Sequence, residues 1–300
     1  MKTGSIHCPP SAQPLNLRAT VEGGHTFCWQ RDYGAGQMYD ETATPSYVTV
    51  VPAIDSPTDK AEVVRVRKSG DSLRWQAMFD ATETLTERLR LDDDLEEICA
   101  TFPSDETITA SVDTRTGLRL PNDPVFPTLI AFICSSQMRV ERIHAMQLRL
   151  AEEFGEEVEF DGQTYYAFPT ATQLAAVDTE ELRDIKLGFR ARYVSDTARA
   201  IAEEEIDLQE PSHLAYPEAQ TFLQQFMGVG EKVADCVLLY SCEHLSAVPI
   251  DTWIRKVLED KYPELVGSSY RDTADAARAY FGPYAGYAQA YLFSSARQRP

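Results

Sequence analysis

The chain has 300 residues, 43% of them hydrophobic, and a formal net charge of −19 at pH 7. No apolar run approaches the ~20 residues that a membrane-spanning helix needs, and the N-terminal segment lacks the apolar core of a signal peptide. We therefore expect a soluble, cytoplasmic protein that contacts no membrane. The six cysteines form no Cys-x-x-Cys pair and the five histidines no zinc signature, so we expect no metal and no cofactor.

The charge argues at first sight against nucleic acid, because phosphate binding normally requires a basic protein. The basic residues, however, are 21 arginines and only 7 lysines, and arginine holds phosphates and base edges through two hydrogen bonds. Abundant acid with scarce lysine resembles the surface of a protein from a salt-loving archaeon. At about 1 M salt the Debye length is roughly 3 Å, so a distant acidic surface would barely repel DNA. An ordinary acidic enzyme is the alternative that composition alone favours.

The first ~85 residues predict an antiparallel sheet. Residues 15–21 alternate apolar and polar side chains, which predicts a half-buried strand. Further strands are predicted over 46–54, 61–67 and 72–79, with a hairpin turn at 68–71. Such a meander needs a helix to cover one of its faces.

After residue 90 the apolar period changes from two residues to 3.6, which predicts a series of helices. An acidic, proline-containing stretch over 90–125 is the expected junction, and residues 165 and 166 suggest a short β excursion. A sheet followed by helices is an α+β arrangement, which we divide into a sheet domain (1–115) and a helical domain (116–300). The predicted helices span 131–136, 140–154, 171–176, 179–185, 195–203, 216–226, 231–240, 251–258, 273–281 and 284–295.

Residues 222–251 carry the strongest functional signal. Gly228 and Gly230 form a tight turn between two helices and allow a close approach to the backbone. The N-terminus of the second helix suits a phosphate, Lys232 lies just inside it, and Asp251 follows a Val-Pro-Ile segment. Taken singly, these features are a common turn, a solvated lysine and a helix N-cap. Together they indicate chemistry on a nucleic acid backbone.

An amine beside a carboxylate suits attack at the sugar C1′ of a nucleoside. The carboxylate of Asp251 would stabilise the positive charge that develops as the base departs, and the unprotonated amine of Lys232 would capture C1′ as a Schiff base. Strand cleavage by β-elimination can follow. Cys236 lies four residues after Lys232, on the same helical face. It is either a charge partner of the amine or a small buried hydrophobe.

Two further pairs of residues point to base flipping. Phe189 beside Arg190, after a glycine, is typical of an aromatic wedge with a guanidinium that meets the base left behind. Gln289 and Phe293 lie four residues apart on one helical face, where an amide can read a base edge and a ring can stack on it. The alternatives are a solvated basic helix for the first pair and aromatic core packing for the second.

Seven motifs stand out along the chain: GHTFCW, LDDDLEEIC, FICSS, GFRARYVS, GVGEKVADC, VPID and GPYAGYAQAYLFS. They resemble the helix-hairpin-helix DNA glycosylases, most of all the eukaryotic-type 8-oxoguanine DNA glycosylase/AP lyases. The resemblance runs from about residue 15 to residue 297, and implies a TATA-binding-protein-like N-terminal sheet followed by an all-helical helix-hairpin-helix glycosylase domain. It implies a monomeric base excision repair enzyme that acts on damaged double-stranded DNA, so we expect it to work at the nucleoid.

The resemblance also assigns roles to single residues. Lys232 and Asp251 would be catalytic, Phe189 the wedge, and Arg142 and Arg190 would meet the cytosine opposite the lesion. It leaves open whether the backbone carbonyls over 224–229 hold a monovalent cation. The damaged-base pocket would consist of Gly24, Cys236, Pro249, Gln289 and Phe293.

Two residues depart from the family pattern, and one alternative function stays open. Gln137 replaces an asparagine that meets the opposite cytosine, and Trp253 replaces a histidine after the aspartate. The alternative is a broad-specificity glycosylase for alkylated bases, although Lys232 argues against an enzyme without a lyase step. A DNA-binding module without catalytic activity is a third reading, which the presence of Lys232 and Asp251 disfavours.

Overall fold

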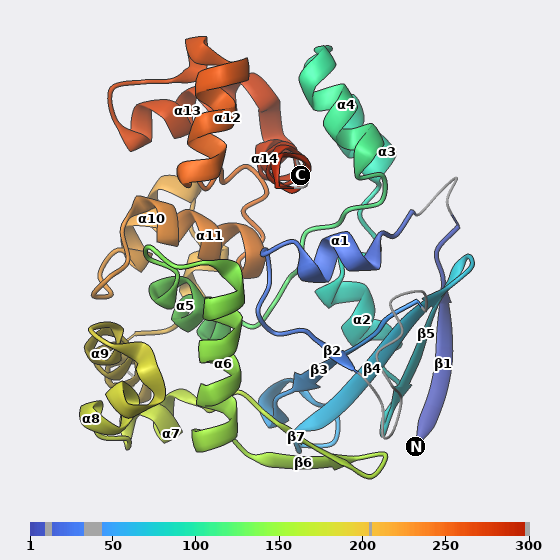
Figure 1. Cartoon of the computed structure of the whole chain (residues 1–300), viewed down its shortest axis with the longest axis vertical. Helices are drawn as coiled ribbons and strands as arrows, with labels where there is room; N and C mark the ends of the chain where they lie inside the picture. The colour runs from blue at the N-terminus through green and yellow to red at the C-terminus, as the bar shows by residue number, and fades with distance from the viewer. Residues whose placement is uncertain (10–13, 33–43, 204–205, 298–300) are drawn as a thin grey trace. The chain divides into compact units, whose positions relative to one another are not determined.

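The computed structural model describes residues 1–9, 14–32, 44–203 and 206–297 (Figure 1). Its contacts divide the chain into two compact units, each assembled from three separate stretches. The first unit consists of Met1–Pro9, Thr26–Glu87 and Phe126–Asp207. The second unit consists of Pro10–His25, Arg88–Val125 and Leu208–Pro300. No helix in the described part of the chain combines the length and apolar character of a membrane span.

The first unit is built on a five-stranded antiparallel sheet, as predicted. Its strands lie in the order β1-β5-β4-β3-β2. Ser69 pairs with Ser72 across a two-residue turn, where Gly70 has a φ of 55°. The two outer strands, β1 and β2, were not predicted. The strands are β1 (Lys2–His7), β2 (Gln30–Asp32), β3 (Ser46–Val51), β4 (Glu62–Ser69) and β5 (Ser72–Ala77).

The strand predicted over 15–21 is wrong, because this segment forms helix α1 (Leu17–Glu22) in the second unit. The Asn16 side chain caps the helix by accepting a hydrogen bond from the Ala19 amide at 3.0 Å. Leu17, Thr20 and Val21 are buried together, which is the i, i+3, i+4 pattern of a helix. Because the helix has only six residues, the same positions of apolar side chains also fit the alternating pattern of a strand.

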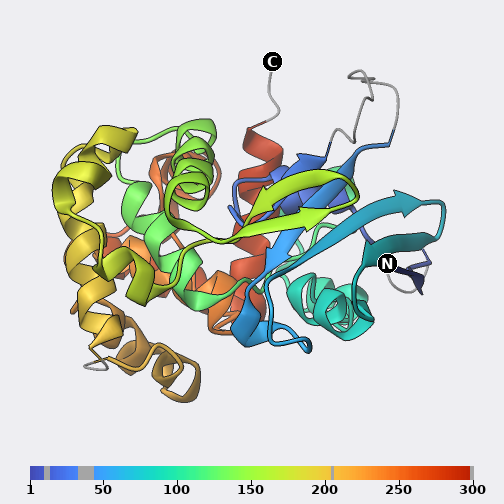
Figure 2. The same cartoon turned by 90° about the horizontal axis from the view of Figure 1, so that it is seen from below.

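A short hairpin, β6 (Glu157–Phe160) with β7 (Gln163–Tyr166), packs on the sheet of the first unit (Figure 2). The two strands therefore interrupt the helices of the second half, as residues 165 and 166 suggested. Arg65 of β4 lies 5.0 Å from the Phe160 ring centroid and donates to Asp161 at 2.6 Å. The buried cluster that joins hairpin and sheet is Val48, Ala61, Val63, Val158, Phe160, Tyr165 and Ala167.

Among the remaining helices of the first unit, α6 has its predicted ends, α2 was not predicted, and the others follow the predicted order with shifted ends. Helix α9 begins at Arg190, five residues before its predicted start, and a kinked turn with Lys186 at a φ of 71° precedes it. These helices are α2 (Thr82–Arg88), α5 (Val125–Cys134), α6 (Val140–Phe154), α7 (Ala171–Ala175), α8 (Thr179–Leu182) and α9 (Arg190–Ala202).

The second unit is helical in its described part. Helix α4 lies inside the stretch that was predicted to be a junction, and the Asp105 side chain caps it. Helix α14 packs closely at Gly286, where a Cβ would lie 2.2 Å from the Leu239 side chain. After α1, these helices are α3 (Leu95–Ala100), α4 (Glu106–Thr114), α10 (Tyr216–Leu223), α11 (Glu231–Ser241), α12 (Thr252–Lys261), α13 (Tyr270–Phe281) and α14 (Ala285–Ala296).

Helix α14 is held in place by hydroxyl and guanidinium groups that bond across the second unit. Tyr287 donates to the Asp93 carboxylate at 2.5 Å, and Tyr291 donates to the Leu118 carbonyl at 3.3 Å. Arg115 donates to the Ser294 carbonyl at 2.9 Å. One acidic residue of the LDDDLEEIC motif therefore fixes the helix that carries Gln289 and Phe293.

Candidate active site

The predicted hairpin lies between α10 and α11. Gly228 has a φ of 85°, in the left-handed region that glycine favours. Gly230 instead has an extended backbone as the N-cap residue of α11, and a Cβ added there would meet no atom within 4 Å. The positive φ thus explains why residue 228 is a glycine. Gly230 is not required by its backbone conformation, and it leaves open space at the exposed N-terminus of α11.

Lys232 and Asp251 both lie within electrostatic reach of Cys236. The Cys236 thiol is 3% exposed. Burial raises its pKa to about 11, a hydrogen bond and the charge of Lys232 lower it, and the charge of Asp251 raises it. Cys236 is therefore a neutral thiol at physiological pH, which favours the second of its two predicted readings, a buried wall beside the amine.

Asp251 is also the N-cap of α12, as its alternative reading predicted. One of its carboxylate oxygens, Oδ1, accepts hydrogen bonds from the amides of Trp253 at 2.9 Å and Ile254 at 2.8 Å. These bonds fix the direction of the side chain. The structural and the catalytic readings of Asp251 are compatible, because a capping carboxylate keeps acceptor capacity for a second partner.

Gln289 lies on α14 and is 5% exposed. Its Nε2 donates to the Pro249 carbonyl at 3.3 Å, which connects two of the predicted pocket residues. Its Oε1 is buried and accepts no hydrogen bond in the described part of the structure. Because buried polar atoms are nearly always paired, this oxygen is available to a donor on a ligand.

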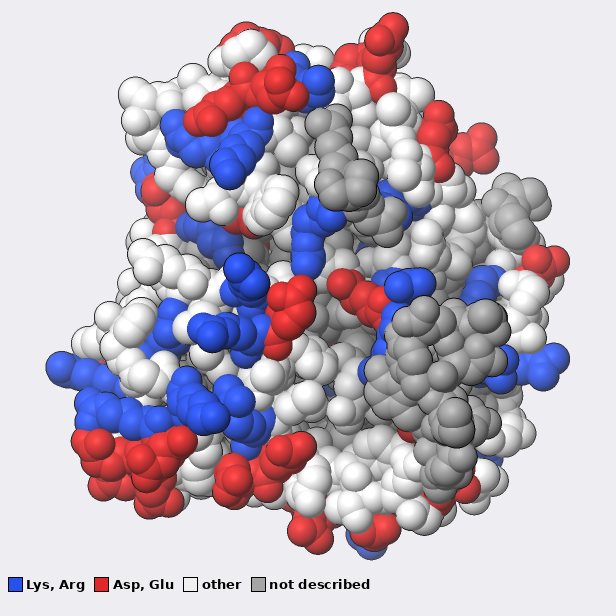
Figure 3. All heavy atoms as spheres, viewed as in Figure 1, with Lys and Arg blue, Asp and Glu red and all other residues white. Residues whose placement is uncertain are grey.

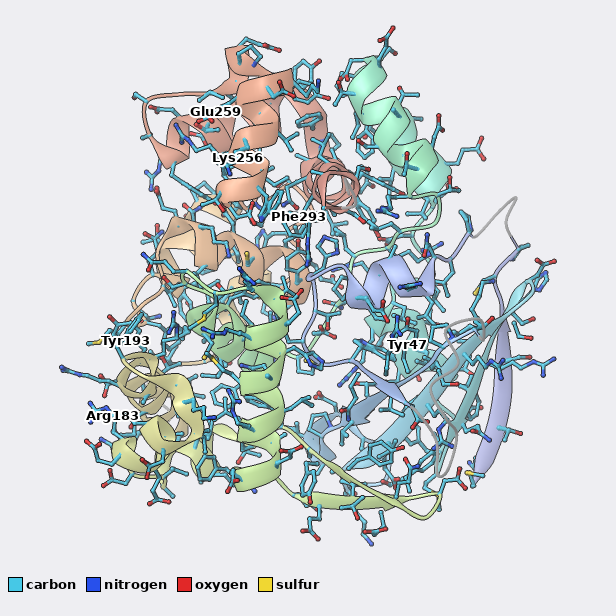
Figure 4. The ribbon with its side chains drawn as sticks, in the orientation of Figure 1. Tyr47, Arg183, Tyr193, Lys256, Glu259 and Phe293 are labelled. Atoms are coloured by element: carbon cyan, nitrogen blue, oxygen red, sulfur yellow. The ribbon has the colours of Figure 1, made fainter. Side chains whose placement is uncertain are left out.

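Phe293 projects from α14 one turn after Gln289 (Figure 4). Its ring centroid lies 5.6 Å from that of His25, and the Arg297 guanidinium lies 5.4 Å from the same ring. Arg297 also donates to the Gly23 carbonyl at 2.8 Å, directly before Gly24, which has a φ of 88°. The segment that contains Gly24 is therefore attached to the end of α14.

His25 is a residue of this site that the sequence did not single out. It is 1% exposed, and its ring lies 5.6 Å from both the Tyr240 and the Phe293 rings. Burial, assisted by the charge of Arg297, lowers its pKa to about 3. The only signal in the sequence was its place beside Gly24 in the GHTFCW motif.

In the first unit, Phe189 is 60% exposed at the start of α9, and Arg190 is buried. The Arg190 guanidinium lies 4.3 Å from the Phe189 ring centroid and donates to the Ser136 carbonyl. The exposed ring is consistent with a wedge. Arg190 connects this exposed ring to the loop that follows α5.

Gln137 follows Ser136 in that loop and is exposed, with a φ of 56°. Asparagine tolerates this left-handed conformation better than glutamine does. The exposed Arg142 lies in the first turn of α6. The structure therefore brings Gln137, Phe189 and Arg190 together, whereas Arg142 makes no hydrogen bond to them among the residues that the structure describes.

Several other arginines have acidic partners along their own helices, as expected for solvated faces. Arg183 pairs with Glu180, Arg192 pairs with Asp196, and Arg255 pairs with Glu259 at 2.9 Å. Figure 3 shows basic side chains over α8 and α9 with acidic side chains beside them, and Figure 4 labels Arg183 and Tyr193 in this region. Because their charges are balanced by these carboxylates, the three arginines add little to a positively charged surface for DNA.

Trp253 is 51% exposed and has the Lys256 ammonium 5.8 Å from its ring centroid. It lines a groove of about 850 Å³ between α4, α12 and α14, together with Lys256, Leu292 and others. A tryptophan at this position offers a stacking surface and an N–H donor, but not the acceptor nitrogen that a histidine can present. Among the residues described, no group of three or more His, Cys, Asp or Glu side chains is placed to hold a metal ion.

Comparison with known proteins gives a consistent result. Residues 130–278 match the model of the HhH-GPD superfamily of base excision DNA repair proteins. A protein of Methanothermobacter thermautotrophicus named as a probable N-glycosylase/DNA lyase is 31% identical over 78% of this chain and 82% of its own. The yeast N-glycosylase/DNA lyase is 29% identical over 93% of this chain and 83% of its own.

A solved structure extends this similarity to the fold. The Clostridium acetobutylicum 8-oxoguanine glycosylase/lyase, in complex with DNA that has cytosine opposite 8-oxoguanine, superposes with a TM-score of 0.83. The two chains are 30% identical over 95% of this chain and 92% of the other. A Bacillus subtilis DNA-3-methyladenine glycosylase is more distant, at 25% identity over 54% of each chain.

Proposed function

Because this chain belongs to the HhH-GPD superfamily of base excision DNA repair proteins, we propose that it is a bifunctional DNA N-glycosylase/AP lyase that excises 8-oxoguanine opposite cytosine. The observation that carries the proposal is that Lys232 and Asp251 both lie within electrostatic reach of Cys236 in the second unit. Similarity to N-glycosylase/DNA lyases along most of the chain supports the same activity.

In this mechanism Lys232 is the nucleophile. Its unprotonated amine attacks C1′, the N-glycosidic bond breaks, and the base departs with the bonding electrons and takes up a proton. The Asp251 carboxylate stabilises the positive charge at C1′ in the transition state. Opening of the sugar gives the Schiff base, loss of a C2′ proton breaks the C3′–O bond, and water then releases the amine.

Gln289 and Phe293 supply recognition of the flipped base. Guanine derivatives carry N–H donors on the base edge, which suit the buried Gln289 Oε1. The Phe293 ring offers a stacking face, and the Gly24 carbonyl is assigned to the additional N7 proton of 8-oxoguanine. Pro249 and Cys236 form walls of the same pocket.

The remaining assignments concern the DNA duplex. Gly228 and Gly230 would receive a phosphate at the N-terminus of α11. Phe189 would fill the space left by the flipped base, and Gln137, Arg142 and Arg190 would meet the unpaired cytosine. In this scheme the second unit carries the chemistry and the first unit reads the opposite strand.

Covalent trapping tests the mechanism. The wild-type protein, incubated with an 8-oxoguanine:cytosine duplex and borohydride, should give a reduced adduct with the DNA, and Lys232→Gln should give none. Asp251→Asn should keep DNA binding and slow excision by about 10²- to 10³-fold. Identical adduct yields from wild type and Lys232→Gln would exclude Lys232 as the nucleophile.

The alternative substrate class is alkylated bases. The more distant similarity to a 3-methyladenine glycosylase weakens this alternative. The presence of Lys232 weakens it too, because a lyase step needs an amine that can form a Schiff base. Release of 3-methyladenine and of 8-oxoguanine from matched duplexes separates the two. Faster release of 3-methyladenine would favour the alternative.

We further propose that the protein acts as a monomer in the cytoplasm, at the nucleoid, of a salt-loving archaeon. The net charge of −19 with only 7 lysines supports adaptation to salt, and a chromosomal substrate supports the location. We also propose that 1–115 and 116–300 are folding domains, which limited proteolysis can test. Cleavage that leaves neither fragment intact would exclude that boundary.

A further inference from the structure

Helix α11 carries a buried acidic residue, Asp235, one turn after Lys232. Asp235 is fully buried. Its Oδ1 accepts hydrogen bonds from the Tyr216 hydroxyl at 2.6 Å and from Gln220 Nε2 at 2.7 Å, and its Oδ2 accepts from the Tyr270 hydroxyl at 2.6 Å. A buried carboxylate is costly unless its oxygens are satisfied. Here donors from α10 and α13 meet at one carboxylate.

The Tyr270 hydroxyl connects this carboxylate to the backbone beside the predicted catalytic aspartate. It accepts a hydrogen bond from the Ile250 amide at 3.3 Å, and the Val248 carbonyl lies 3.4 Å away. Ile250 directly precedes Asp251, and the carbonyl of Pro249 accepts from Gln289. The Tyr270 hydroxyl thus holds the segment 248–251. This segment carries the Asp251 carboxylate and the Pro249 carbonyl that accepts from Gln289.

We propose that Asp235 and Tyr270 are positioning residues for base excision, which hold the 248–251 segment so that Asp251 and Gln289 meet the flipped nucleoside. This inference rests on the proposed function. A hydroxyl has a single hydrogen: while Asp235 is ionised, that hydrogen points to Oδ2, and the oxygen's lone pairs face the Ile250 amide. Donation to an ionised carboxylate polarises the hydroxyl and makes its oxygen a stronger acceptor for the Ile250 amide. Protonation of Asp235 removes that negative charge and so weakens the bond to Ile250.

The electrostatic surroundings make this arrangement sensitive to pH. Burial raises the pKa of Asp235 to about 6, while the hydrogen bonds from Tyr216, Tyr270 and Gln220 and the charge of Arg278 lower it. The Arg278 guanidinium also donates to the Tyr216 hydroxyl at 2.7 Å. Cys236, the next residue on α11, interacts with the charges of Asp235, Lys232 and Asp251. The charge of Asp275, which pairs with Arg278, acts on Tyr216.

Two tyrosine variants separate positioning from general support of the carboxylate. Tyr270→Phe removes the hydroxyl that joins Asp235 to Ile250, whereas Tyr216→Phe removes a matched hydroxyl that contacts the same carboxylate from α10. Single-turnover excision from an 8-oxoguanine:cytosine duplex should fall about 10- to 100-fold in Tyr270→Phe. It should stay within about threefold of wild type in Tyr216→Phe. Cleavage of a preformed abasic site depends mainly on Lys232 and should stay within about threefold in both.

The pH profile of Asp235→Asn gives a second readout. This variant is neutral at every pH, so its excision rate should lie well below that of wild type at about pH 7.5 and approach it at about pH 5. Equal losses in the two tyrosine variants, a constant ratio of wild type to Asp235→Asn across pH, or unfolding of Tyr270→Phe at the assay temperature would overturn the inference. If wild type itself released no 8-oxoguanine, the proposed function would fail instead.

Discussion

His25 is a buried imidazole whose state depends on pH. Its ring packs against those of Tyr240 and Phe293, and burial holds its pKa near 3. The folded protein thus keeps His25 neutral, while the unfolded chain takes up a proton near the ordinary pKa of 6.5. The stabilising contribution is present above pH 6.5 and is lost as the pH falls from 6.5 toward 3.

We therefore expect His25→Phe to resist acid better than wild type. The phenyl ring can keep the packing against Tyr240 and Phe293, and it removes the proton uptake. Between pH 6.5 and 4, wild type should lose about 3 kcal/mol more of its free energy of unfolding than the variant does. Urea titrations at several pH values measure this difference, and exposed His213→Gln serves as the control. Equal pH dependence in wild type and His25→Phe would contradict the prediction.

At this scale, local spacing pointed to some residues of the candidate site and not to others. Gln289 and Phe293 followed from their separation by four residues on one helix, and Lys232 followed from its place after a glycine turn. His25 did not follow, because its contacts join residues 25, 240 and 293, which no local pattern relates. The hydroxyl of Tyr270 beside Ile250 is likewise a tertiary contact.

The hairpin between α10 and α11 contains two glycines whose constraints differ. Gly228 has a positive φ, whereas Gly230 has an extended backbone and open space where a Cβ would lie. If a phosphate approaches the N-terminus of α11, a methyl group at residue 230 would occupy part of that space. The backbone conformation therefore requires glycine at residue 228, and the proposed phosphate requires glycine at residue 230.

We expect Gly230→Ala to weaken DNA binding about 10-fold, equivalent to about 1.4 kcal/mol, while the loss of an N-cap glycine costs the fold about 0.5–1 kcal/mol. Gly228→Ala is the matched change and should destabilise the fold by about 1–2 kcal/mol, because alanine is strained at that φ. Fluorescence anisotropy with duplex DNA and thermal melting measure the two effects. Wild-type affinity in Gly230→Ala would count against phosphate binding at this glycine.

Among the elements, long amphipathic helices and the central strands were predictable, whereas short or edge elements were not. The predicted helix over 140–154 is α6, with the same ends. Helix α1 was read as a strand, since six residues do not separate a period of two from one of 3.6, although Asn16 was a capping signal. Helix α4 was overlooked despite the Asp105 cap, because its stretch is acidic.

For the whole molecule, the acidic residues have two kinds of role. Some have structural contacts: Asp93 bonds Tyr287, and Asp94 and Asp105 cap helices. Many others, such as Glu152 and Glu153 on α6, are exposed and contribute to the net charge of −19. At low ionic strength this charge opposes both the compact state and the approach of DNA.

We therefore expect stability and excision to persist in concentrated salt. Raising KCl from about 0.1 M to about 2 M shortens the Debye length from roughly 10 Å to less than about 3 Å, which screens the self-repulsion of the surface and its repulsion of DNA. The short-range contacts proposed for Gln289, Phe293 and Phe189 are much less affected. The melting temperature should rise with KCl, and the excision rate at about 2 M should equal or exceed that at about 0.1 M. Sucrose at equal osmolality is the control, because it is excluded from the protein surface without screening charges. Full activity at low salt with loss near 1 M would refute adaptation to salt.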